Sequence, residues 1–286
     1  MSEERNEATV WATGQRQPQG QRDDLYLPEV LDHPAKMWVQ IARHAIERYS
    51  EPGQTVLDPM AGIGTTLIEA IRAGRNAVGV ECEPRWVELA RQHLDRATAA
   101  HPGVWGEVFL GDATRLEEAL SRWRGQAPVD MVLTSPPYGA ITHGRPKSRR
   151  VTGGAIRPHA HRYAAGAAHP NQLATGSLRR LGTGLEQVWA GCRDALRPGG
   201  VLVVCARPYT DDGALIDFPA VVAHTAGLAG FALIERRAAL LGRWDGSALH
   251  VHASFFHKHQ VRLAHQAGRT VFLRAHEDVL VFRSPS

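Results

Sequence analysis

The sequence predicts an α/β protein built on a doubly wound, mainly parallel sheet. Short apolar runs that end in polar residues alternate with longer segments of helical spacing, and Gly or Pro separates them. Such an alternation places helices on both faces of the sheet. The chain has 286 residues, of which 43% are hydrophobic, so it can bury a sizeable core and is not wholly disordered.

The first half of the chain contains four predicted strands. Residues 1–24 are polar without a period, so we expect a flexible tail, followed by a single domain over 25–286. Asp32-His33-Pro34 predicts the start of a helix that runs to Tyr49. Strands are predicted at 55–58, 76–81, 107–110 and 129–133. Between them, one helix is predicted to end at Ala73, and two others to span 84–99 and 116–123.

The second half continues the alternation after a long irregular segment. Helices are predicted at 185–196 and 218–228, and strands at 201–206, 231–241 and 279–282. The irregular segment, residues 139–185, has no helical or strand period and is predicted to be an insertion in the domain.

This insertion also holds the positive charge of the chain. The net charge is +4, yet the 47 residues from 139 to 185 contain eight basic side chains and no Asp or Glu. A block of one sign inside a folded chain favours a polyanion partner, with a solvated loop as the alternative. Four cations close to its start are candidate substrate-binding residues: Arg145, Lys147, Arg149 and Arg150.

Several other functions are not indicated. Cys82, Cys192 and Cys205 are scattered, so neither a disulfide framework nor a cysteine zinc site is expected. Three His-x-His pairs lack a nearby third ligand, and we expect no metal. No apolar run approaches the ~20 residues of a membrane span. The start of the chain lacks the apolar core of a signal peptide, so a cytoplasmic location is expected.

A glycine-rich turn follows the first long strand. The run Asp58-Pro59-Met60-Ala61-Gly62-Ile63-Gly64-Thr65-Thr66 connects a strand to a helix with two glycines where a backbone and a ligand approach closely. Leu67 replaces the third small residue of the dinucleotide fingerprint, and the P-loop lysine is missing. The turn therefore predicts a site for a nucleoside without a pyrophosphate.

Two further acids follow the next two strands. Glu81 ends the second and can accept hydrogen bonds from both ribose hydroxyls, while Asp112 follows the third and can meet an adenine amino group. Each acid alone could be a helix cap or a surface charge. Together with Asp58 they favour a bound nucleoside, because the carboxyl ends of parallel strands share one edge of the sheet.

The fourth strand ends in Thr134-Ser135-Pro136-Pro137-Tyr138, a polar residue and an aromatic residue around two prolines. An exocyclic amine is a poor nucleophile because its lone pair is spread into the base. The Ser135 hydroxyl and the Pro136 carbonyl could accept its two hydrogens and localise that lone pair. Tyr138 is expected to stack on an extruded base.

These motifs together resemble the S-adenosylmethionine-dependent amino methyltransferases of DNA, the N4-cytosine and N6-adenine class. The resemblance covers about residues 30–138 and 185–286, including His33-Pro34-Ala35-Lys36-Met37 and the closing Glu277–Arg283. It implies a seven-stranded Rossmann-like methyltransferase sheet with one antiparallel strand. It also implies a donor site with the following residues: His33, Lys36, Asp58, Met60, Gly62, Gly64, Thr65, Glu81, Asp112 and Thr134.

The resemblance also implies the target-amine site, formed by Ser135, Pro136 and Tyr138, with Pro137 beside the substrate. Met60 stands where the family usually has Phe, and the donor motif precedes the amine motif, unlike the commonest order for Ser-Pro-Pro-Tyr enzymes. Ser135 resembles the N4-cytosine group more than the adenine group. We therefore expect an enzyme that methylates N4 of a flipped cytosine in double-stranded DNA, within a restriction-modification system.

Three alternatives stay open: N6-adenine methylation of DNA, methylation of a guanine or adenine amine in RNA, and a non-catalytic nucleic-acid-binding module that keeps the fold. A second nucleic-acid surface is a further hypothesis, with the following residues: Phe255, Phe256, Lys258, His259 and Arg262. Helix packing explains the two phenylalanines equally well. Trp244 is expected in the core.

Overall fold

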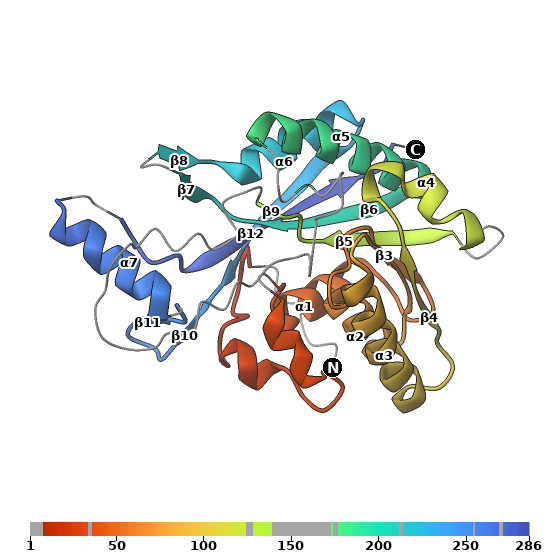
Figure 1. The fold of residues 1–286 in the computed structure, drawn as a ribbon, viewed down its shortest axis with the longest axis horizontal. Helices are drawn as coiled ribbons and strands as arrows, with labels where there is room; N and C mark the ends of the chain where they lie inside the picture. The colour runs from red at the N-terminus through yellow and green to blue at the C-terminus, as the bar shows by residue number, and fades with distance from the viewer. Residues whose placement is uncertain are drawn as a thin grey trace.

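A computed structural model describes residues 8–33, 36–123, 128–138, 173, 177–211, 214–253, 255–268 and 271–285. Within these residues, one eight-stranded sheet runs through the molecule in the order β1-β9-β12-β6-β5-β2-β3-β4 (Figure 1). Its strands are β1 (Val10–Trp11), β2 (Thr55–Asp58), β3 (Asn76–Glu81), β4 (Gly106–Leu110), β5 (Val129–Thr134), β6 (Leu196–Ala206), β9 (Ala232–Leu240) and β12 (His276–Arg283).

The strand directions confirm the predicted fold class. β2 pairs in parallel with β3 and β5, β3 with β4, and β5 with β6. Only β12, among the strands of this sheet that the structure describes, runs antiparallel to its neighbours β6 and β9. The seven expected strands are therefore present, and the short β1 adds an eighth beside β9.

Helices cover both faces of the sheet (Figure 1). One face packs against α1 (Val39–Tyr49), α2 (Thr65–Arg72) and α3 (Pro84–Ala100), and the other against α4 (Leu116–Ala119), α5 (Leu178–Ala195) and α6 (Phe218–Leu228). Along β5, Met131 and Leu133 belong to the first core and Val132 to the second. A strand buried on both faces must be apolar at every position, which explains its continuous hydrophobic run.

The order of the strands creates a switch point between β2 and β5. From β2 the chain proceeds outward through β3 and β4, and then returns to β5 on the other side of β2. The connections after β2 and after β5 therefore diverge, and the carboxyl ends of two such strands are where open α/β sheets usually form a ligand crevice. Asp58 ends one strand of the pair, and Thr134 ends the other.

The expected flexible tail is wrong for residues 8–24. Val10 and Trp11 pair with Ala238 and Ala239 of β9, and Trp11 is buried against Tyr49 of α1. The buried Gln21 side chain donates to the carbonyl of Thr13 at 3.0 Å. These partners lie on distant segments, so local polarity could not reveal them.

Two helix boundaries also differ from the prediction. The first helix begins at Val39 rather than near Pro34, because the carbonyls of His33 and Met37 accept hydrogen bonds from the side chains of Lys36 and Arg22. α5 begins at Leu178, seven residues earlier than expected, where Ser177 caps it by accepting from the N–H of Arg180. The end of the basic insertion is thus helical.

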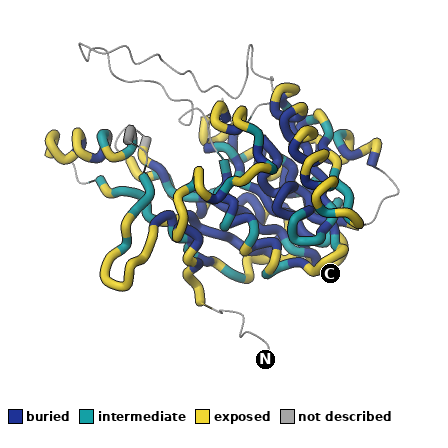
Figure 2. The backbone as a smooth tube through the Cα atoms, turned by 90° about the horizontal axis from the view of Figure 1, so that it is seen from below, coloured by how far each residue is buried: buried dark blue, intermediate teal, exposed yellow. Residues whose placement is uncertain are grey.

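Beyond the sheet, the chain forms a protruding lobe (Figures 1 and 2). It consists of the hairpin of β10 (Gly242–Trp244) and β11 (Leu249–Val251), followed by α7 (Phe255–Gln266). Trp244 is 52% exposed there, so the expectation of a core tryptophan is wrong. A second small hairpin pairs β7 (Tyr209–Asp211) with β8 (Ala214–Ile216). None of the helices in the described segments is both long and apolar enough for a membrane span.

Candidate active site

The buried carboxylate of Asp58 stabilises the glycine turn after β2 through two hydrogen bonds. One oxygen of its buried carboxylate accepts from the N–H of Met60 at 3.0 Å, and the other accepts from the Thr66 hydroxyl at 2.7 Å. Gly62 and Gly64 have φ of 52° and 84°, a region that glycine adopts without a steric penalty. Asp58 and the two glycines therefore fix the shape of the turn.

Asp58 also contacts the far side of the switch point. Burial raises the pKa of its carboxyl to about 6, and hydroxyl groups of Thr66 and of Thr134, at the end of β5, oppose that shift. Asp58 and Thr134 come from the two strands whose connections diverge. The structure thus brings these two predicted residues together at the crevice.

Glu81 joins the end of β3 to the same turn. Its carboxylate accepts from the N–H of Gly62 and from the N–H of Glu83, each at 2.9 Å. Burial raises the pKa of Glu81, and these two N–H groups oppose the shift. A carboxylate oxygen can accept more than one hydrogen bond, so this geometry is compatible with ribose hydroxyls as additional donors.

Asp112 is a helix cap, which was the alternative to a ligand-binding role. One of its oxygens accepts from both the N–H and the hydroxyl of Thr114, at 2.9 and 2.8 Å, and so caps the short helix that starts at Ala113. The side chain is buried at the end of β4. Its contact with an adenine stays a prediction.

The segment before α1 covers the glycine turn. The His33 ring lies over Gly62, where an added Cβ would come within 3.2 Å of Nε2, and it packs edge-on against Trp86 at 4.7 Å. The Lys36 ammonium donates to the His33 carbonyl at 2.6 Å. Burial and then the charge of Arg22 lower the pKa of Lys36 to about 8.

His93 of α3 is a supporting residue that the sequence did not single out. The Leu27 N–H donates to Nε2 at 3.0 Å, so Nε2 must be the acceptor, and Nδ1 carries the proton that is donated to the Ile63 carbonyl at 2.7 Å. The ring is fully buried, and burial lowers its pKa. A neutral His93 thus connects the glycine turn to the N-terminal segment.

The amine motif forms the loop after β5. Ser135 and Pro137 are half-buried, and Pro136 is buried. Tyr138 is only 5% exposed and packs against Phe218 and Tyr209, with ring centroids 5.1 and 5.9 Å away.

Tyr138 does not present an open face to a base in this structure. The Arg207 guanidinium lies over its ring, 4.9 Å from the centroid. Stacking of Tyr138 on a base, which we expected, therefore requires that Arg207 moves aside. Burial raises the pKa of the Tyr138 hydroxyl, which has no hydrogen-bond partner among the described residues.

The donor residues fit a nucleoside sulfonium with an amino-acid tail. Gly64 starts α2 without a side-chain cap, so the N–H groups of its first turn can meet a carboxylate. The Thr65 hydroxyl beside them is buried and has no hydrogen-bond partner in the described part of the chain. Together with Glu81, these groups offer partners for the carboxylate and the ribose of S-adenosylmethionine.

The predicted basic contacts Arg145, Lys147, Arg149 and Arg150 lie outside the described residues. Of the basic insertion, only Leu173 and the residues from Ser177 onward are described. Within the described ranges, no group of three or more His, Cys, Asp or Glu side chains is placed to hold a metal ion.

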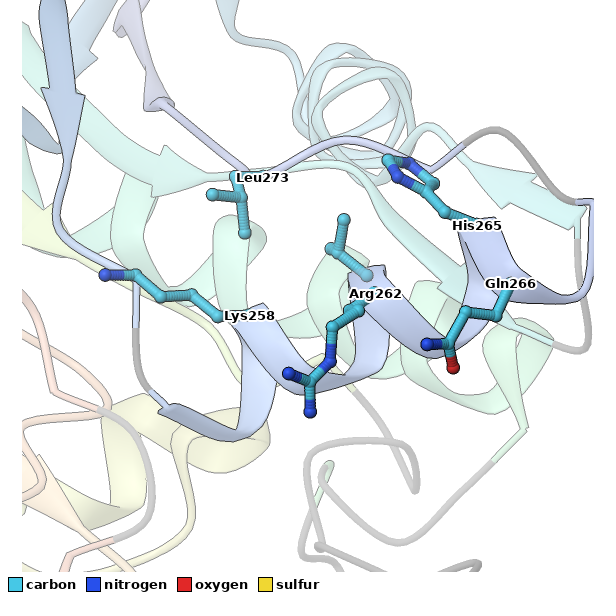
Figure 3. A pocket seen from close by; sticks show the side chains of 6 residues that line it. Lys258, Arg262, His265, Gln266 and Leu273 are labelled. Carbon is cyan, nitrogen blue, oxygen red and sulfur yellow. The ribbon is translucent and has the colours of Figure 1, made fainter.

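A surface hollow of about 470 Å³ lies on the lobe, between α7 and the segment before β12 (Figure 3). Its walls include Lys258, Arg262, His265 and Leu273, and none of its lining residues is acidic. It is formed by α7 rather than by strand ends, so it is separate from the donor residues.

The comparisons with known proteins agree with the donor side of this site. The profile of a family described as DNA methylase matches residues 2–92. Residues 2–92 are thus similar to the DNA methylase family. The match includes the glycine turn and Glu81 and ends before the amine motif. The matched family indicates S-adenosylmethionine as the cofactor.

The names of the curated relatives refer to different substrates, some to DNA and some to tRNA. The chain is 34% identical over 73 residues to the type II methyltransferase M.BglI of Bacillus subtilis, covering 24% of this chain and 21% of that protein. It is 34% identical over 109 residues to a tRNA (guanine(10)-N2)-dimethyltransferase of Methanothermobacter thermautotrophicus, covering 37% and 29%. It is 33% identical over 72 residues to the DNA adenine methyltransferase YhdJ of Escherichia coli, covering 25% and 24%.

The matched parts are thus between a fifth and a third of the relatives' own lengths. The chain is therefore similar to part of these methyltransferases, and the reaction, the base and the polymer are matters for a proposal.

Proposed function

We propose that this methyltransferase transfers a methyl group to the exocyclic amine of a base flipped out of DNA, with N4 of cytosine as the target. The observation that carries the proposal is the switch point itself. The donor residues Asp58 and Glu81 and the amine motif from Ser135 to Tyr138 lie at the carboxyl ends of neighbouring strands of one sheet.

In this proposal, the loop after β5 prepares the amine. The Ser135 hydroxyl and the Pro136 carbonyl accept its two N–H groups, which localises the nitrogen lone pair and points it toward the donor residues. When bound, S-adenosylmethionine supplies an electrophilic methyl group, so that a new N–C bond replaces its S–C bond and the amine loses one proton to water.

Binding of the donor is assigned to the turn and the first two strand ends. The first turn of α2 and Thr65 hold the carboxylate of the methionine portion, and Glu81 holds the ribose. Met60 and His33 flank the turn, while Asp58 keeps its shape. Asp112 contacts the amino group of the donor's adenine.

An RNA amine is the second candidate, favoured by the tRNA guanine-N2 relative. The preference for DNA rests on the family of residues 2–92 and on the type II relative. The preference for cytosine over adenine rests on Ser135 at the first position of the amine motif.

One assay separates the polymers. The wild-type protein is incubated with tritiated S-adenosylmethionine and either duplex DNA or RNA of mixed sequence, and the label in each polymer is counted. We expect label in DNA. Label in RNA alone would favour the second candidate, and no label in either would favour a binding module without catalysis.

A further inference from the structure

Arg207 lies over the Tyr138 ring, and Arg274 lies at the same edge of the sheet; neither has a place in the site as described so far. Arg207 directly follows β6, and Arg274 precedes β12, which pairs with β6 so that Asp278 faces Ala206. β5, which leads to Tyr138, is the other neighbour of β6. The antiparallel start of β12 therefore brings Arg274 to the same edge of the sheet as the amine motif.

Arg207, Tyr138 and Glu277 form one cluster of contacts, and Arg274 precedes Glu277 by three residues. Arg207 lies over the Tyr138 ring and also pairs with Glu277, whose side chain is 5% exposed. Arg274 is half-buried, and its charge interacts with those of Arg207 and Glu277 and with Tyr138. The carbonyl after it, that of Ala275, accepts from the N–H of Leu241 at 2.8 Å, which fixes this segment beside β9.

The cluster carries more positive than negative charge. Glu277 already pairs with Arg207, and Arg274 forms no ion pair within the described residues. Burial and the charge of Arg207 lower the pKa of Arg274 to about 10. The pKa of His257 on α7 is also lowered, by burial and by the charges of both arginines, so this ring is neutral at pH 7.

We propose that Arg207 and Arg274 form a phosphate-binding pair that holds the backbone of the target nucleotide while its base enters the amine site. This inference rests on the proposed function. A single sugar separates a flipped base from its own phosphates, so a base beside Ser135 and Tyr138 brings a phosphate to the mouth of this loop. Planar guanidinium groups match phosphate oxygens in pairs of hydrogen bonds.

The pair also explains how the Tyr138 ring becomes available. In the structure, Arg207 covers that ring. A phosphate beside Arg274 would draw Arg207 away from the ring, since a charge-assisted hydrogen bond to phosphate is stronger than a cation–π contact. Phosphate binding and exposure of the base-stacking face are then one event.

Arg274 is the residue to change, because removal of Arg207 would leave Glu277 buried without its partner. The affinity for a fluorescent duplex of mixed sequence is measured by anisotropy between about 50 and 200 mM salt for wild type, Arg274→Gln, Arg274→Lys and Arg283→Gln. Arg283 is the matched control, an exposed arginine at the opposite end of β12. Donor affinity, measured by calorimetry, verifies that each variant is folded.

We expect Arg274→Gln to weaken duplex binding about fivefold to tenfold and to reduce the slope of log K against log salt by about 0.9, the contribution of one phosphate. Arg274→Lys should keep the slope, and Arg283→Gln should match wild type. An active Arg274→Gln protein with the slope of Arg283→Gln would overturn the phosphate pair and leave the proposed function intact. A wild type that neither binds nor methylates DNA would overturn both.

Discussion

At the scale of single residues, the acids and hydroxyls at the strand ends have two kinds of task. Asp58 accepts hydrogen bonds within the glycine turn and its helix, and His93 connects that turn to the N-terminal segment, so both residues shape the site. The Thr65 and Tyr138 hydroxyls have no hydrogen-bond partner among the described residues, and the Ser135 hydroxyl is the proposed acceptor of the target amine. Substitutions of the second group should therefore affect binding or catalysis more than stability.

The first prediction concerns Ser135. Ser135→Ala removes one acceptor for the target amine but little apolar packing, because the side chain is half-buried. Losing one oriented hydrogen bond in the transition state should cost about 2–4 kcal/mol, a fall of roughly 30- to 1,000-fold in the methylation rate. Single-turnover assays measure this rate, and calorimetry should show unchanged donor affinity.

Ser247→Ala on the β10–β11 turn is the control, since Ser247 is exposed and remote from β5. A Ser135→Ala enzyme as fast as the control would exclude the assigned role.

The second prediction concerns Glu81. Glu81→Ala should weaken the binding of S-adenosylmethionine, because charge-assisted hydrogen bonds to the ribose contribute about 1.5–3 kcal/mol each, or roughly 10- to 150-fold in affinity. Calorimetric titration of the donor tests this, with Glu107→Ala on the exposed side of β4 as the control. Equal donor affinity in both variants would contradict the assignment of Glu81.

At the scale of elements, the sequence predicts best those helices and strands whose bounds depend on their own residues and not on distant partners. β2, β3 and α6 have the predicted bounds, because each is a compact apolar run between Gly, Pro or polar residues. β1 was missed because two residues carry no period and their partner strand β9 lies far along the chain. The start of α1 was misplaced because side chains, not backbone groups, bond the preceding carbonyls.

The same argument applies to the candidate site. The strand ends at Asp58, Glu81 and Ser135 could be predicted, because a short motif and the strand alternation fix them. Arg207 and Arg274 could not, since each is an ordinary arginine in the sequence and becomes notable only when β6 and β12 pair.

The glycine turn gives the third prediction, with a matched pair of variants. Gly62 and Gly53 both have positive φ, but an added Cβ meets His33 at 3.2 Å at Gly62 and nothing within 4 Å at Gly53. Both Ala variants should lose about 1–2 kcal/mol of stability from the left-handed backbone. Only Gly62→Ala should also weaken donor binding, by displacing His33 from the turn. Thermal denaturation measures the loss of stability, and titration measures donor affinity. Equal donor affinity in the two variants would contradict the role of His33 and Gly62 in donor binding.

At the scale of the whole molecule, two long segments of the chain contain basic but no acidic side chains. The basic insertion starts directly after Tyr138, and residues 246–276, which include α7, also contain no Asp or Glu. The lobe with α7 protrudes from the sheet (Figure 2). Both segments are therefore candidates for contacts with a polyanion.

The fourth prediction tests the insertion. If four to six of its cations contact phosphates, log K should fall against log salt with a slope of roughly −4 to −5. Neutralising Arg145, Lys147, Arg149 and Arg150 together should flatten the slope by about two to four units and weaken all duplex sequences alike. Donor affinity should not change. A slope equal to that of wild type would assign duplex binding to the lobe instead.

The central claim is that the edge of the sheet between β2 and β5 methylates an exocyclic amine. The most direct test digests DNA to nucleosides after incubation with the wild-type protein and S-adenosylmethionine, and identifies the methylated nucleoside by mass spectrometry against standards. We predict N4-methylcytosine, with the yield falling in Ser135→Ala. N6-methyladenine would correct the base but keep the amine chemistry, whereas a methyl group on carbon, such as 5-methylcytosine, would contradict the account.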